Sequence, residues 1–272
     1  MQAICRDAGI DLLVLKGPHL AYTVWPVPTE RVWCDLDILA RPDQFDAAIE
    51  ALTRQDFKQP PFDRRHRASA PCYHNIALQG PYGIHIELHR DLTPHGRYPV
   101  SIEDLFCRAE AFWFLETEAR GLAPADLLLH LCLHMMKSYF CAVERKHIRD
   151  IALVVTRRTI DWRLFLSNAG AAGARTGCWV ALRAAATQHG AVVPERVLTD
   201  LTPTPRRQQW LARWLDPAVF PVYRGPARSK WDYQWRLGLA LMDRPLDWLP
   251  LLMKYGWLRI MDLMGRIGSS RS

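Results

Sequence analysis

The sequence predicts an α+β fold, in which a small mixed β-sheet with flanking helices precedes a helical region. Short apolar runs and segments that alternate apolar and polar residues, both typical of strands, lie between residues 12 and 89. Beyond Pro124, apolar residues recur at helical spacing, and prolines separate the segments. We therefore expect two domains, an α/β core over residues 1–120 and a helical domain over residues 121–272.

The first expected strand is the apolar run at residues 12–15, which ends at Lys16, Gly17 and Pro18. A Gly-Pro pair ends a strand, and proline is tolerated in the first turn of a helix, so a helix is expected to follow over residues 19–24. Glycine lets the backbone approach a ligand closely, and a helix N-terminus attracts anions. With the charge of Lys16, this turn is either a phosphate cradle or an ordinary strand-to-helix connection with a surface lysine.

The second expected strand, residues 34–40, carries Asp35 and Asp37. Successive side chains of a strand point to opposite faces, so both carboxylates share one face. The side chains of Leu36, Ile38 and Ala40 point the other way, mostly into the core. On this pattern Cys34 is a small core residue. Two neighbouring carboxylates repel each other unless a cation lies between them, and hard oxygen ligands suit Mg²⁺ or Mn²⁺. The alternative is a turn or a solvated strand face.

A helix is expected over residues 42–54, because an apolar stripe runs along Phe45, Ala48, Ile49 and Leu52. The loop that follows, at residues 58–71, contains a cluster of arginines. Such a loop either contacts the phosphates of a substrate or is simply solvated.

The third informative strand is expected at residues 82–89, after a turn that joins it to a partner strand at residues 73–78. Its side chains alternate between two faces, with Ile84, Ile86 and Leu88 on one and His85, Glu87 and His89 on the other. If this strand lies beside residues 34–40, Glu87 is the third acid of the same site. The two histidines fit a solvated or hydrogen-bonded strand face, or the edge of a cleft, better than a closed zinc site.

The helical region is expected to contain helices at residues 124–140, 146–158, 160–170, 175–189, 204–215, 229–243 and 246–263. His130 and His134 lie four residues apart on one helix face, which suits the wall of a cleft or a packed face better than a metal site. A basic cluster that includes Lys146 and His147 either binds a phosphate of the substrate or is solvated.

Composition fits a reduced, soluble chain that either has an anionic partner or is simply a basic protein. The formal charge is +7, the isoelectric point is near 9.2, and seven cysteines show no metal-binding spacing. An odd number of cysteines argues against a secreted disulfide framework, so a cytoplasmic location is the simplest expectation. No apolar run of eighteen residues is present, so no transmembrane segment is expected.

The motifs in combination resemble a known family. Leu15-Lys16-Gly17, Arg31, Asp35-Leu36-Asp37-Ile38-Leu39 and the segment 84–89 resemble the uncharacterised nucleotidyltransferase-like family of the polymerase-β nucleotidyltransferase superfamily. Segments 129–134, 148–152 and 160–162 resemble the helical half of that family, so the resemblance covers about residues 8–190. It implies a nucleotidyltransferase core followed by a helical domain.

The resemblance also implies an activity: Mg²⁺- or Mn²⁺-dependent transfer of a nucleoside monophosphate from an NTP to a hydroxyl or phosphate acceptor, with release of pyrophosphate. The acids Asp35, Asp37 and Glu87 would be the metal ligands and catalytic residues. The phosphates would be bound by Lys16, Gly17 and Arg31. The cleft and acceptor side would be formed by His85, His89 and His134. The acceptor would be a small molecule, a peptide or protein, or an RNA.

One position departs from the superfamily pattern, because Pro18 follows Gly17 where Ser or Gly is usual. Proline has neither a hydroxyl nor an N–H to bind phosphate. A catalytically degenerate nucleotide- or partner-binding module on the same fold is therefore an alternative function. A second alternative is a peripheral membrane or assembly protein, since Trp231, Trp235, Trp248 and Trp257 lie in basic segments near the C-terminus.

Overall fold

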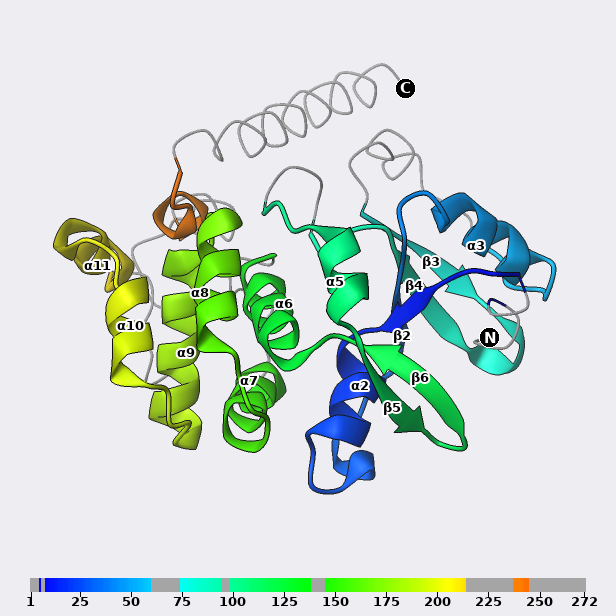
Figure 1. The fold of residues 1–272 in the computed structure, drawn as a ribbon, viewed down its shortest axis with the longest axis horizontal. Coiled ribbons are helices and arrows are strands. Elements are labelled where there is room, and N and C mark those ends of the chain that lie inside the picture. Colours follow the sequence, from blue (N-terminus) through cyan, green and yellow to red (C-terminus); the bar gives the residue numbers. More distant parts are fainter. Residues whose placement is uncertain are drawn as a thin grey trace, which may run out of the picture.

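A mixed β-sheet lies at the centre of the amino-terminal half of the protein (Figure 1). The computed structural model describes residue 5 and residues 8–59, 74–93, 98–137, 145–213 and 237–244. Within these residues the sheet has six strands in the order β3-β4-β2-β1-β6-β5. The strands are β1 (Leu12–Val14), β2 (Leu36–Ala40), β3 (Asn75–Gln79), β4 (His85–His89), β5 (Glu110–Phe114) and β6 (Thr117–Gly121).

The strand pairing brings the predicted acidic strands together. Strand β1 is antiparallel to β2 and parallel to β6, and β2 is parallel to β4. In the β2–β4 pair, Asp37 lies directly opposite Glu87. The outer strands β3 and β5 pair antiparallel with β4 and β6. The predicted α+β fold, the hairpin of β3 with β4 and the contact between the two acidic strands are thus confirmed.

The helices form two sets, one next to the sheet and one that extends away from it to one side (Figure 1). In the first half they are α2 (Lys16–Thr23), α3 (Phe45–Thr53) and α5 (Ile102–Arg108), with 3₁₀ turns η1 (Pro28–Glu30) and η3 (Pro81–Gly83). The second set comprises α6 (Pro124–Lys137), α7 (Arg145–Arg157), α8 (Trp162–Ala171), α9 (Arg175–His189), α10 (Glu195–Leu201) and α11 (Pro205–Leu211). A further helical segment spans residues 237–241.

Most of the predicted helices are confirmed, with shifted ends. Helix α11 is shorter than the predicted 204–215, and the segment 237–241 is the described part of the predicted 229–243. The predicted helix at 246–263, the four C-terminal tryptophans and most of the basic loop at 58–71 lie outside the described residues. The sequence pattern does not predict α5, α10 or the β5–β6 hairpin. Helices α5 and α10 have seven residues each, too few for a clear helical period.

Within the described part of the chain, three apolar clusters contain residues of the sheet, and the two larger ones lie on its opposite faces, as strand alternation requires. Ile38 and Leu88 pack with Leu52 of α3 on one face. Leu13 and Leu39, which point the other way, belong to the larger cluster that also contains the cores of α6, α7 and α9. Burying each such side chain contributes about 1.5–3 kcal/mol. Asp37 has the same parity as Leu39, so it points toward the helical side. The division into two domains near residue 120 stays a prediction.

One residue departs from the predicted alternation. Ile84 is 45% exposed rather than buried with Ile86 and Leu88, because η3 ends at Gly83 and β4 begins only at His85. Among the described helices, none has the length and apolar character needed to cross a membrane.

Burial of His19 in α2 predicts an acid sensitivity of the fold. The ring is 2% exposed and packs against Phe112, and burial together with the charge of Arg158 lowers its pKa to about 3. In the unfolded chain a histidine titrates near 6.5. Between these two pH values only the unfolded chain binds the proton, so stability falls as the pH drops below about 6.5. At pH 5 the loss is about 2 kcal/mol.

The measurement is urea unfolding of the wild type and of His19→Leu at pH 7.5 and pH 5. We expect the free energy of unfolding of the variant to fall by about 2 kcal/mol less than that of the wild type over this interval. Equal losses in the two proteins would mean that His19 does not carry the acid sensitivity.

Candidate active site

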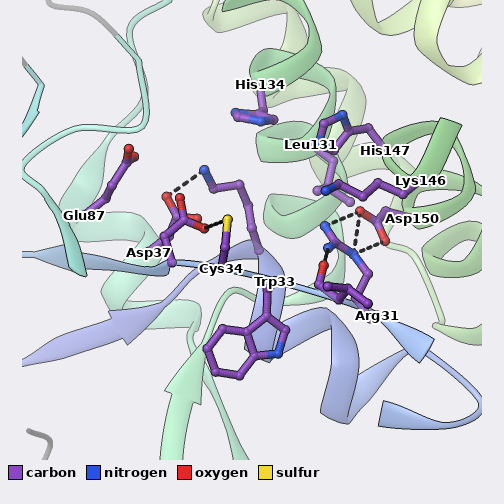
Figure 2. A pocket seen from close by; sticks show the side chains of 14 residues that line it. Arg31, Trp33, Cys34, Asp37, Glu87, Leu131, His134, Lys146, His147 and Asp150 are labelled. Carbon is purple, nitrogen blue, oxygen red and sulfur yellow. Dashed lines mark hydrogen bonds and ion pairs between the residues drawn. The ribbon is translucent and has the colours of Figure 1, made fainter. Parts of the chain in front are cut away.

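Three acidic side chains converge on one cavity of about 270 Å³. Asp37 of β2 and Glu87 of β4 are register partners on neighbouring parallel strands, and Asp35 lies just before β2. All three line the cavity. Figure 2 shows Asp37 and Glu87 on one side of it, and Lys146, His147 and Asp150 of α7 on the other. The cavity therefore lies where the sheet meets the first helices of the second half.

The strand that carries the acids begins later than predicted. Strand β2 starts at Leu36, so Asp35 precedes it in a bend. The alternation of a strand does not extend back to Cys34, which is exposed and lines the cavity. The prediction that Cys34 is a core residue is wrong for this reason. Its sulfur lies 4.0 Å from Oδ1 of Asp35.

Asp37 is the most enclosed of the three acids and has two nitrogen partners. The Nζ of Lys16 lies 2.7 Å from Oδ1 of Asp37, and Nε2 of His89 lies 2.9 Å from the same oxygen. Burial by itself would raise the pKa of Asp37, but the hydrogen bond with His89 and the charge of Lys16 outweigh it and lower that pKa well below its usual range. Asp37 is therefore ionised at neutral pH.

Glu87 is held by neighbours on two strands. Nδ2 of Asn75 in β3 donates a hydrogen bond of 2.9 Å to Oε2 of Glu87, and Nε2 of His89 lies 3.5 Å from the same oxygen. The contact with His89 lowers the pKa of Glu87 against the opposing effect of burial. Glu87 is thus a second fixed negative charge beside Asp37.

Asp35 is destabilised in its ionised form by its surroundings, which include the other two acids. Burial raises its pKa, and the charges of Asp37 and Glu87 raise it further. A divalent cation would relieve this repulsion. Ligand atoms of Asp37, Glu87 and His89 lie within 4.8 Å of one another, the spacing of groups that can hold one ion. The donor set is dominated by carboxylate oxygens, so it fits a hard cation such as Mg²⁺ or Mn²⁺.

The first residues of α2, which begins at Lys16 directly after β1, line the cavity beside the acids. Lys16 has φ of +38°, a conformation that costs energy for a residue other than glycine and often occurs at functional sites. Gly17 lines the cavity, and a Cβ at this position would lie 2.8 Å from Cβ of Trp33. The backbone of Gly17 thus packs closely under Trp33, and a larger residue would have to displace that side chain. Pro18 is buried within the first turn of α2.

On the helical side, Arg31 forms a buried ion pair with Asp150. Nε of Arg31 donates to Oδ1 of Asp150 at 2.8 Å, and Nη2 donates to Oδ2 at 2.8 Å. Nε1 of Trp25 also donates to Oδ1 of Asp150 at 2.8 Å, and Nη1 of Arg31 donates to the carbonyl of Val32 at 2.7 Å. Arg31 lines the cavity, but much of its hydrogen-bonding capacity is committed to these partners. Its contact with phosphate stays a prediction.

The three predicted cleft histidines occupy different places. His134 of α6 lines the cavity, and its ring lies 5.4 Å from that of His147. His89 is 1% exposed and contacts Asp37 and Glu87. His85 is exposed at the start of β4 and is not among the residues that line the cavity. The structure therefore brings two of the three close to the acids.

Sequence reasoning missed some residues of this site. Asp150 and Trp33 line the cavity, and Asn75 holds Glu87 from β3. Asp150 lies 119 residues from Arg31 in the chain, so only the folded structure reveals the pair. A signal was present for Asp150, since an acid in the middle of an apolar helix face requires a buried partner.

Comparison with known proteins gives one family and a few distant structural neighbours. Residues 2–190 match the family described as uncharacterised nucleotidyltransferase. No curated protein gives a significant match. ANT(2'')-Ia in complex with adenylyl-2''-tobramycin has a TM-score of 0.40 at 10% identity, over 57% of this chain and 83% of that chain.

Two other solved structures have similar scores. Lincomycin-bound LnuA, a lincosamide antibiotic adenylyltransferase, has a TM-score of 0.39 at 10% identity, over 58% of this chain and 93% of that chain. An antigenic nucleotidyltransferase-like protein from Paracoccidioides brasiliensis has a TM-score of 0.33 at 15% identity, over 56% and 70% of the two chains.

Proposed function

The chain belongs to the uncharacterised nucleotidyltransferase family, and from this premise we propose that it is a metal-dependent enzyme. It transfers a nucleoside monophosphate from an NTP to a hydroxyl or phosphate group of an acceptor and releases pyrophosphate. The observation that carries the proposal is the meeting of Asp35, Asp37 and Glu87 at one cavity, with Asp37 and Glu87 opposite each other on parallel strands.

Each acid has a role that follows from its surroundings. Asp37 and Glu87, whose pKa values are lowered by their partners, supply permanent negative charge for a Mg²⁺ or Mn²⁺ ion. Asp35, directly before β2, would be the third acidic ligand of this ion. A bound ion would orient the phosphates of the NTP and lower the pKa of the acceptor hydroxyl. Glu87 or Asp37 would accept the proton of that hydroxyl, and the greater accessibility of Glu87 supports Glu87 in this role.

The basic residues of the cavity oppose the charge of the triphosphate. Lys16 lies beside Asp37, and Lys146 lines the opposite wall. Phosphoryl chemistry leaves little covalent work for the protein, so positioning and charge stabilisation provide most of the rate. Lys16 and Lys146, on opposite sides of the cavity, suit a polyphosphate that spans it. This arrangement offers a substitute for the phosphate contacts that Pro18 cannot make.

The acceptor is expected to enter along the helical wall. Leu131, His134 and His147 line this side and present both apolar and imidazole surface. Such a surface suits a hydroxyl-bearing acceptor with an apolar or anionic part. A small molecule, a peptide or an RNA end each satisfies this description.

The direct test is a nucleotide-transfer assay on the full chain. Each of the four labelled NTPs is incubated with the protein, Mg²⁺ or Mn²⁺, and acceptor pools of small molecules, RNA and protein. We expect release of pyrophosphate and one labelled acceptor class, with loss of both when EDTA removes the metal and recovery when Mn²⁺ is added back. The absence of pyrophosphate and labelled product under all these conditions would contradict the proposal.

A non-catalytic nucleotide-binding module is the second candidate, because Pro18 and the close packing of Gly17 under Trp33 weaken the usual phosphate turn. Calorimetric titration with an NTP separates the two functions. A binding module retains its affinity in EDTA and tolerates Asp35→Asn, whereas the enzyme loses metal-dependent binding in both cases.

A further inference from the structure

A single buried histidine contacts two of the three acids. Nε2 of His89 lies 2.9 Å from Oδ1 of Asp37 and 3.5 Å from Oε2 of Glu87. The side chain is 1% exposed. A nitrogen placed between two ionised carboxylates must carry its hydrogen toward them, since oxygen and nitrogen lone pairs would otherwise repel each other. His89 therefore acts as a hydrogen-bond donor to the acids.

Sheet register explains why one residue can reach both strands. His89 lies opposite Leu39 in the parallel β2–β4 pair, two positions beyond the opposed pair of Asp37 and Glu87. Residues two apart in a strand share a face, so His89 lies on the same face as both acids. On its other side β4 pairs with β3, which places Asn75 opposite His89.

The contacts favour one oxygen of each acid. Oδ1 of Asp37 receives His89 and Lys16, while Oε2 of Glu87 receives Asn75 and lies near His89. In the part of the chain that is described, these hydrogen bonds leave Oδ2 of Asp37 and Oε1 of Glu87 for other ligands. A carboxylate fixed through one oxygen presents the other in a defined direction, as outer-shell partners do at metal sites.

We propose that His89 is a positioning residue that fixes Asp37 and Glu87 so that Oδ2 and Oε1 face the same cation. This inference rests on the proposed function, because it assigns a role within that metal site. It goes beyond that function in naming the residue that couples the two strands.

A direct bond from His89 to the ion is the competing arrangement, and two observations oppose it. His89 is not among the described residues that line the cavity, whereas Asp37 and Glu87 are. Its Nε2 is also already directed at Oδ1 of Asp37 at hydrogen-bond distance, so this nitrogen has no lone pair to offer in that orientation. The ring therefore contacts both acids without being part of the cavity lining.

The test is Mn²⁺ binding, measured by electron paramagnetic resonance without nucleotide, on the wild type and two polar variants. Gln in His89→Gln can place its amide nitrogen near the position of Nε2, whereas Asn in His89→Asn is too short to do so. We expect His89→Asn to bind Mn²⁺ about 10–100-fold more weakly than the wild type and His89→Gln to recover most of that loss. Thermal unfolding of each variant separates this effect from a loss of folding.

His189→Asn is the control, because it makes the same substitution at a histidine that is exposed at the end of α9 and is not among the residues that line the cavity. Its Mn²⁺ affinity should equal that of the wild type. Wild-type affinity in His89→Asn, or a directly bound ¹⁴N in the pulsed spectrum of the wild type, would overturn the positioning role alone. Failure of the wild type to bind Mn²⁺ at all would overturn the proposed metal-dependent function together with it.

Discussion

Asp37→Asn is expected to abolish nucleotidyl transfer, with a loss of at least about a thousandfold, equivalent to about 4 kcal/mol of transition-state stabilisation. The substitution keeps the shape of the side chain but removes its charge, and Asp37 is the acid that contacts both Lys16 and His89. An amide cannot hold a divalent ion against the charge of Lys16. The measurement is pyrophosphate release at saturating NTP and Mg²⁺, together with the Mn²⁺ affinity of the variant.

Asp46→Asn provides the control for this prediction. Asp46 is exposed in the first turn of α3, on the far side of the sheet from the cavity, and its loss should leave transfer unchanged. If Asp37→Asn retained more than about a tenth of wild-type turnover, Asp37 would not be a metal ligand. The proposed chemistry would then need another residue at its centre.

Of the substitutions considered, Asp150→Ala is expected to lower the free energy of unfolding most, by about 3–5 kcal/mol. Asp150 has no exposed side-chain surface, and its substitution leaves the guanidinium of Arg31, which is 6% exposed, without its carboxylate. The indole N–H of Trp25 loses its acceptor in the same variant. An uncompensated buried charge is costly because water cannot replace the missing partner. The measurement is the free energy of unfolding in urea.

A double variant distinguishes the effect of losing the ion pair from the effect of leaving one buried charge without its partner. Arg31→Met combined with Asp150→Leu removes both charges and should restore much of the stability lost in Asp150→Ala. The control is Arg54→Ala, since Arg54 and Glu50 form an exposed pair on α3 at 4.0 Å, which contributes less than about 0.5 kcal/mol. If Asp150→Ala unfolded at the wild-type urea concentration, the buried pair would not stabilise the fold.

The same pair connects the two halves of the protein at the cavity. Arg31 precedes β2, which carries Asp37, and Asp150 lies on α7, which carries Lys146. Loss of the pair is therefore expected to alter the separation of the acidic and basic walls as well as the stability. Once its folding is established, the transfer activity of the double variant reports on this separation together with the predicted phosphate contact of Arg31.

The sequence by itself determined the acidic strands and the direction in which their acids point. Period-two alternation places Asp37 and Glu87 on the faces opposite to Ile38 and Leu88, and the structure keeps this parity. Strand alternation is a local property of the backbone, so it can be read without knowledge of the partners. The membership of the chain in its family, which the motifs indicated, is confirmed by the match over residues 2–190.

Tertiary structure alone decided which residues support those acids. That His89 contacts two of the acids, whereas His85 is exposed, depends on where β4 begins and on its register with β2. The exposure of Cys34 depends on where β2 begins, and the burial of Arg31 depends on a carboxylate 119 residues away. Strand ends and long-range pairs are set by the packing of the whole chain. Local patterns therefore specify which way a side chain points but not which groups it meets.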